Sequence, residues 1–252
     1  MRIIAGEFRR RFLRTPADES VTRPIPDRVK ESVFGLLRGH CEGANVLDAF
    51  AGTGAIGLEA VSRGAVHCVL VEQDKAMASI LKYNIEQLGA QDRCELVVGD
   101  ALGASVLARC RRPLTLAFFD PPYPLMEQPV GFRRVITQVC AAVRLLSEDG
   151  FAVLRTPCPL MWAREAPLTQ PPRREHRKKG KDRFDWMVDE NAGVGRSRRK
   201  PVEAVVQEVE VATHGAPNQP RITVEDLTVL DAVGPETHVY GGMAVHLYMR
   251  KR

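Results

Sequence analysis

Short, almost continuously apolar runs alternate with segments of helical periodicity between residues 46 and 156. The runs are VLDAF (46–50), VHCVLVE (66–72), ELVVGD (95–100), LTLAFFD (114–120) and FAVLRT (151–156). Strands without a polar face must be covered on both sides, which is characteristic of parallel sheets with helices packed on each face. The sequence therefore predicts an α/β fold with a mostly parallel sheet and helices on both faces.

The alternation stops after residue 156. Residues 157–222 are rich in Pro, Arg and Lys, and we expect a basic, partly disordered insertion there with one β-like piece at 202–212. Two segments, 226–233 and 243–250, predict antiparallel strands that complete the sheet. The expected organisation is a basic hairpin and helix (1–40), a ligand-binding core (41–156), the insertion (157–222) and the closing strands (223–252).

The positive charge is concentrated in two segments. Residues 173–200 carry eleven Lys or Arg against five Asp or Glu, and the first fourteen residues carry five Arg against one Glu. Basic patches on a nearly neutral body indicate a polyanionic partner, most often a nucleic acid. Solvated surface charge is the alternative explanation for residues 173–200.

Several classes of protein are disfavoured by what the chain contains. No apolar run approaches the roughly 20 residues that span a membrane, and the first residues lack the apolar core of a signal peptide. The six cysteines never form a CxxC pair, which argues for reduced thiols and against a disulfide framework or a zinc site. We expect a cytoplasmic monomer that binds no metal and no membrane.

A glycine-rich loop follows the first expected strand. Residues 52–57 match G-x-G-x-x-G, and Glu72 lies 20 residues after Gly52 at the end of the next strand. A dinucleotide fold has the same spacing, so an NAD enzyme is one alternative. Asp48, however, would face the pyrophosphate that such a loop binds and would repel it. S-adenosylmethionine carries an ammonium group and no phosphate, and therefore fits this loop better.

Three acids end three successive strands, and the carboxyl ends of parallel strands are where open α/β sheets bind ligands. With S-adenosylmethionine, Asp48 would face the ammonium group, Glu72 would accept from the ribose hydroxyls, and Asp100 would accept from the adenine amine. A helix-capping role is the alternative for any one of these acids. The residues expected to bind the cofactor are Asp48, Phe50, Gly52, Gly54, Glu72, Asp100 and Ala101.

The fourth strand ends in Asp120-Pro121-Pro122-Tyr123. An exocyclic amine on a nucleobase is a poor nucleophile because its lone pair is delocalised into the ring. The Asp120 carboxylate and the Pro121 carbonyl can accept its two N–H groups from directions that the consecutive prolines hold in place. Tyr123 offers a ring on which a flipped-out base can stack. We expect these four residues to be catalytic.

Several segments resemble one bacterial family, the guanine-N2 methyltransferases of 16S ribosomal RNA. They are MRIIAGEFRRRFL, RPIPDRVKESVF, VLDAFAGTGAIGLEAVSRGA, VLVE and FFDPPY. The resemblance covers residues 1–156 and resumes at 226–250. It implies the class I S-adenosylmethionine-dependent methyltransferase fold, with a seven-stranded sheet. It also implies methylation of a guanine N2 amine in 16S ribosomal RNA, either naked or within an assembling small subunit.

The resemblance further implies that the arginine-rich hairpin contacts RNA and that Arg23, Asp27 and Arg28 help to close the pocket. The residues expected to bind RNA are Arg9, Arg10, Arg11, Arg23 and Arg28. The chain departs from the family where Ile25 and Pro26 replace the usual threonines, and where Arg155 replaces a common acid.

Two other functions remain open at this point. Methylation of adenine N6 in DNA or RNA uses the same acid-Pro-Pro-aromatic motif. An RNA-binding relative without catalysis is the second alternative, and the intact acids and glycine loop argue against it.

Overall fold

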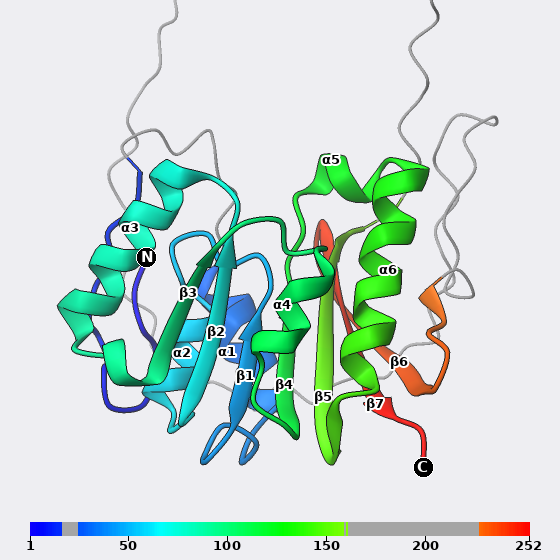
Figure 1. The fold of residues 1–252 in the computed structure, drawn as a ribbon, viewed down its shortest axis with the longest axis horizontal. Helices are drawn as coiled ribbons and strands as arrows, with labels where there is room; N and C mark the ends of the chain where they lie inside the picture. The colour runs from blue at the N-terminus through cyan, green and yellow to red at the C-terminus, as the bar shows by residue number, and fades with distance from the viewer. Residues whose placement is uncertain (17–24, 159, 161–226) are drawn as a thin grey trace, which may run out of the picture. The chain divides into compact units, whose positions relative to one another are not determined.

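The computed structural model describes residues 1–16, 25–158, 160 and 227–252 (Figure 1). The expected β-like piece at 202–212, the basic segment 173–200 and Arg23 lie outside these residues. The strands are β1 (Asn45–Asp48), β2 (His67–Glu72), β3 (Cys94–Val98), β4 (Leu114–Phe119), β5 (Leu146–Pro157), β6 (Ala232–Tyr240) and β7 (Met243–Arg250).

The strands form one seven-stranded sheet in the order β3-β2-β1-β4-β5-β7-β6. Strands β1 to β5 are parallel, whereas β7 runs antiparallel to both β5 and β6. The predicted α/β architecture, with its mostly parallel sheet and closing hairpin, is confirmed.

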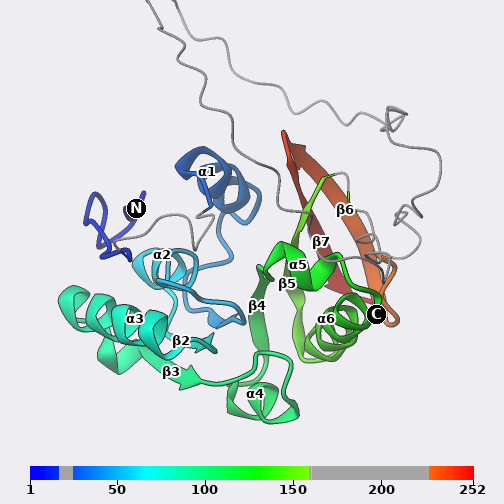
Figure 2. The same ribbon diagram turned by 90° about the horizontal axis from the view of Figure 1, so that it is seen from above.

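Helices cover both faces of the sheet (Figure 2). Helices α1 (Asp27–Leu36), α2 (Gly57–Ser62) and α3 (Lys75–Leu88) lie on one face. Helices α4 (Ala104–Arg109), α5 (Tyr123–Met126) and α6 (Pro129–Val143) contribute to the other. Along β2, Cys68 and Leu70 belong to the first hydrophobic core, and Val69 and Val71 to the second. Successive side chains of a strand point to opposite faces, so a doubly covered strand is apolar throughout.

One expected strand was wrong. The segment 226–233 was expected to be the first closing strand, but β6 begins only at Ala232 and continues to Tyr240. Among the strands that the structure describes it pairs only with β7, and its register shifts between Val233 and Glu236, around Gly234-Pro235. Proline cannot donate to a strand ladder and is tolerated at edges and bulges, so this edge strand lacks a regular apolar pattern.

The described residues also show the state of the cysteines, the character of the helices and the grouping of possible metal ligands. All six cysteines are free thiols, as expected. Within the described ranges, no helix is long and apolar enough to cross a membrane. The same ranges contain no cluster of three or more His, Cys, Asp or Glu side chains arranged to hold a metal ion.

A fully buried carboxylate on α2 holds the N-terminal hairpin against the sheet. Glu59 accepts hydrogen bonds from the Ile4 and Ala5 amides at 2.7 and 3.0 Å. It also pairs with Lys30 of α1 at 3.2 Å, and both side chains are 0% exposed. Burial lowers the pKa of Lys30, and the charge of Glu59 opposes that shift. Residues 1–16 and α1 therefore pack on the core rather than forming an appendage.

Substituting Glu59 with Gln should lower the free energy of unfolding by about 3–5 kcal/mol, because it leaves the Lys30 charge buried without its partner. Urea denaturation would measure the loss. Glu86→Gln is the matched control, since its pair with Lys82 is exposed and 4.0 Å long, and it should cost about 0–1 kcal/mol. Equal losses of unfolding free energy in the two variants would contradict the proposed role of the Glu59–Lys30 pair.

Candidate active site

Three carboxylates gather at the carboxyl edge of the sheet. Asp48 ends β1, Glu72 ends the neighbouring β2, and Asp120 follows β4 on the other side of β1. Burial raises the pKa of Asp48 to about 7, and the charges of Asp120 and Glu72 add to that shift. The parallel topology therefore brings together acids that lie up to 72 positions apart in the chain.

Asp48 is directed into the protein rather than toward an open pocket. Its carboxylate is 1% exposed, and its Oδ2 accepts the Gly57 amide at 2.8 Å. Its Oδ1 makes no hydrogen bond of normal geometry to the described residues. The amide at the start of a helix attracts a carboxylate, so Asp48 fastens α2 beneath the glycine loop. The sequence had suggested direct exposure to a ligand ammonium group.

Glu72 holds the glycine loop from the adjacent strand. Its Oε2 accepts the Gly52 amide and its Oε1 accepts the Asp74 amide, both at 2.8 Å. The Ala51 amide also donates to the Val71 carbonyl at 2.8 Å. The loop is thus fixed across the ends of β1 and β2, and the half-buried Glu72 carboxylate stays within reach of a ligand.

The loop glycines differ in what surrounds them. Gly52 and Gly54 have positive φ values of 55° and 88°. A Cβ at Gly54 would lie 2.6 Å from Leu81 Cδ1 and 2.7 Å from Leu58 Cδ1, whereas one at Gly52 would meet nothing within 4 Å. Gly54 is therefore required by core packing, and Gly52 faces open space. Phe50, between β1 and the loop, is half-buried against the second core.

Asp100 follows β3 and is tied to α6. Its Oδ1 accepts the Leu102 amide at 2.9 Å, and its Oδ2 pairs with Arg134 Nη2 at 2.6 Å. Burial alone would raise the pKa of Asp100, but the Leu102 N–H and Arg134 together lower it. The neighbouring Ala101 is buried, and its carbonyl accepts Gln138 Nε2 at 3.2 Å. Sequence reasoning missed Arg134 and Gln138, although they lie four residues apart on one helix face.

Asp120 forms an ion pair with Arg155 of β5. The register of β4 and β5 pairs Phe119 with Leu154, so the next residue of each strand lies beside the other. Arg155 Nε lies 2.5 Å from Asp120 Oδ1, and the two side chains are only 10% and 15% exposed. Burial raises the pKa of Asp120, and Arg155 opposes that rise. The Arg155 guanidinium also lies 5.9 Å from the centre of the Tyr123 ring.

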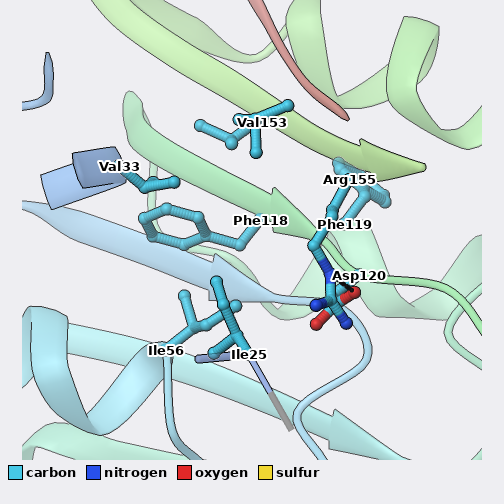
Figure 3. A pocket seen from close by; sticks show the side chains of 9 residues that line it. Ile25, Val33, Ile56, Phe118, Phe119, Asp120, Val153 and Arg155 are labelled. Atoms are coloured by element: carbon cyan, nitrogen blue, oxygen red, sulfur yellow. Dashed lines mark hydrogen bonds and ion pairs between the residues drawn. The ribbon is translucent and has the colours of Figure 1, made fainter. Parts of the chain in front are cut away.

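An apolar recess leads to this ion pair (Figure 3). Figure 3 shows Asp120 and Arg155 side by side at one end, with aliphatic side chains and Phe118 around the remainder. The lining residues are Ile25, Val33, Ile56, Phe118, Phe119, Asp120, Val153, Arg155 and Val245. Its empty volume, open mouth included, is about 270 Å³. Ile25 thus contributes an apolar wall to this recess.

The other expected site residues lie around this edge and on the hairpin. In the motif itself, Pro121 is buried, Pro122 is exposed and Tyr123 is half-buried at the start of α5. Asp27 pairs with Arg2 at 2.9 Å. The remaining expected RNA contacts in the described residues are all exposed, namely Arg28 on α1 and Arg9, Arg10 and Arg11 on the hairpin.

Comparison with known proteins gives consistent matches. The sequence model of the family described as "Conserved hypothetical protein 95" matches residues 1–181. The YlbH protein of Bacillus subtilis is 36% identical over 154 residues, which are 61% of this chain and 80% of that protein. "Ribosomal RNA small subunit methyltransferase D" of Escherichia coli strain K12 is 41% identical over 133 residues, 52% of this chain and 65% of that enzyme.

Solved structures match the fold. The Escherichia coli yhhF protein superposes with a TM-score of 0.60 at 24% identity, covering 100% of this chain and 98% of that chain. Together with the strand order and the antiparallel β7, this match identifies the class I methyltransferase fold.

The two loop glycines should respond differently to alanine. Gly52→Ala should lower the free energy of unfolding by about 1–2 kcal/mol, because only the left-handed backbone conformation is strained. Gly54→Ala should cost about 1–3 kcal/mol more, since its methyl group must displace Leu81 and Leu58. Thermal or urea unfolding of both variants would test the difference. A Gly52 variant at least as destabilised as the Gly54 variant would contradict the packing at this loop.

Proposed function

The chain belongs to the family described as "Conserved hypothetical protein 95", and we propose that it is a methyltransferase acting on ribosomal RNA. In its finer form, the proposal is S-adenosylmethionine-dependent methylation of a guanine N2 amine in small-subunit ribosomal RNA. The observation that carries it is the placement of Asp120-Pro121-Pro122-Tyr123 beside an acidic, glycine-lined sheet edge. The named Escherichia coli relative supports the choice of RNA.

The acidic side chains at this sheet edge fit S-adenosylmethionine. The described edge presents Glu72 and Asp120 above the buried Asp48, and the two nearby arginines, Arg134 and Arg155, are each paired with an acid. A pyrophosphate would meet this negative charge without an unpaired cation, whereas a sulfonium and an ammonium are favoured by it. When bound, the cofactor supplies an activated methyl group. Glu72 would accept from its ribose hydroxyls, and Asp100 from its adenine amine.

The residues around the recess then act on the base. The Tyr123 ring supports a base that has left its stack, and the apolar walls keep water from the amine. One N–H of the amine donates to Asp120 and the other to the Pro121 carbonyl, which directs the lone pair toward the methyl group. As nitrogen gains the methyl group, it loses one proton, which Asp120 is placed to accept.

Arg155 is a positioning residue in this proposal. Its Nε holds Asp120 Oδ1, so that Oδ2 is the oxygen left to accept from the substrate. Its positive charge also favours the ionised carboxylate in a site whose burial favours the neutral acid. Arg155 therefore offsets the cost of placing a carboxylate in an apolar recess.

The function can be tested directly with labelled S-adenosylmethionine and unmodified 16S ribosomal RNA, both naked and in small-subunit particles. Digestion to nucleosides and mass spectrometry should identify N2-methylguanosine. N6-methyladenosine would establish the adenine alternative. Absence of label from both substrates would overturn the proposal.

Asp120→Asn should lower turnover by roughly two to three orders of magnitude, the scale for removing one preorganised contact in a transition state. Cofactor affinity should change little, because the binding contacts lie on β1, β2 and β3. Single-turnover kinetics and calorimetry would measure the two quantities separately. Turnover close to that of the parent would remove this carboxylate from the chemistry.

Arg155→Met should move the acidic limb of the pH–kcat profile upward by roughly 1–3 pH units, the usual effect of an adjacent opposite charge on a carboxyl. Burial raises the pKa of Asp120 and Arg155 lowers it, so its removal leaves the ionised form populated only at higher pH. Arg155→Lys keeps a charge and should shift the limb less. Superimposable profiles for the parent and Arg155→Met would refute the positioning role.

A further inference from the structure

Phe12 is an exposed aromatic residue on an ordered hairpin. Its side chain is 70% exposed, whereas the nearby Phe8 and Leu13 are buried in the core. Phe12 forms a bridge with Arg2, and the adjacent Arg11 carbonyl accepts the Ile3 amide at 2.9 Å. The ring is therefore presented by a paired backbone.

The side chain and the backbone of the buried Ser62 fix this hairpin in place. Ser62 Oγ accepts the Phe8 amide at 2.9 Å and donates to the Ala5 carbonyl at 2.6 Å. The backbone approaches so closely that a Cβ on Gly6 would lie 1.7 Å from the Ser62 carbonyl oxygen. A surface held this rigidly loses little conformational entropy when a ligand binds.

The hairpin also connects to the glycine loop through Asn84. This fully buried side chain accepts the Arg14 amide at 2.8 Å and donates to the Arg14 carbonyl at 3.0 Å. It donates as well to the Thr53 carbonyl of the loop at 2.9 Å. The chain that follows Phe12 is thus tied to the proposed cofactor site.

The charge on the hairpin is not neutralised. Arg9, Arg10 and Arg11 are exposed, and none forms an ion pair within the described part of the chain. Glu7, the acid of the same hairpin, is already paired with Arg93 at 2.8 Å. Arg10 adopts a φ of 69°, a conformation that is rare for residues other than glycine and often marks functional sites.

A second aromatic ring extends this surface. Tyr83 of α3 is 45% exposed, and the Arg14 guanidinium lies 5.1 Å from the centre of its ring. Aromatic rings among unpaired arginines are the combination with which proteins bind single-stranded nucleic acids: rings stack on bases, and arginines contact phosphates. In a duplex the base faces are covered, so a stacking ring favours unpaired strands.

We propose that the hairpin surface, formed by Arg9, Arg10, Arg11 and Phe12, binds an unpaired stretch of the substrate RNA. Phe12 stacks on a base, and the three arginines contact phosphates. This inference rests on the proposed function for the identity of the RNA, and it adds that the substrate is single-stranded at this contact.

The test measures binding of the full chain, without cofactor, to a fluorescent unpaired RNA oligonucleotide and to a duplex containing the same sequence. Phe12→Leu should weaken binding to the unpaired RNA by roughly 5- to 150-fold, the range for losing one stacked base, and Phe12→Trp should preserve it. Binding to the duplex should change less than about 2-fold, since no stacking contact is lost there. Val130→Ala, at an equally exposed apolar site on α6, is the matched control.

Salt dependence separates the two kinds of contact. Phe12→Leu should leave the slope of log K against log salt unchanged, whereas Arg11→Gln should reduce it by about 0.7, the value for one phosphate of a single strand. The proposal would be overturned if Phe12→Leu bound unpaired RNA as tightly as the parent protein does. It would also be overturned if the substitution weakened binding to the duplex as much as binding to unpaired RNA. The binding assay contains no cofactor and is independent of methyl transfer. If the parent protein failed to transfer a methyl group, the proposed function would be refuted, but the result of the binding assay would stand.

Discussion

A single buried carboxylate, Glu59, connects the parts of the molecule on which the site depends. It lies on the short helix α2, whose first turn is held by Asp48 beneath the glycine loop. The same helix binds the N-terminal hairpin and Lys30 of α1. Because an unpaired charge in this interior would be strongly destabilising, the hairpin, α1 and the loop must adopt their positions together. The hairpin surface and the recess are thereby built on one scaffold.

The acids at the carboxyl edge of the sheet also depend on their partners. Placing several acids at neighbouring strand ends is unfavourable unless each has a partner. The structure satisfies this requirement with backbone amides for Asp48 and Glu72, and with arginines for Asp100 and Asp120. The acids nevertheless differ, because Asp48 and Glu72 accept hydrogen bonds from backbone amides, whereas Asp100 and Asp120 are each paired with an arginine side chain. Arginine partners belong to helices and strands far along the chain, so tertiary packing sets the charge state of this edge.

Much of the fold was predictable because parallel strands buried on both faces are continuous apolar runs, which are recognisable in the sequence. Strands β1 to β5 overlap the five expected apolar runs, and helices lie between them as the predicted alternation requires. The edge strand β6 was misplaced since it needs no continuous apolar face and tolerates Gly234-Pro235. Helices α4 and α5 were missed as well, being only six and four residues long, too short for helical periodicity to show.

The amino-acid sequence by itself determined the fold class, the glycine loop and which acids would stand at the strand ends, because these follow from local patterns and from parallel topology. Only the tertiary structure decided what those acids contact. Asp48 proved to be buried against Gly57, Asp100 to pair with Arg134, and Asp120 to pair with Arg155. Such partners depend on strand register and helix docking between residues up to 35 positions apart, which no local pattern encodes.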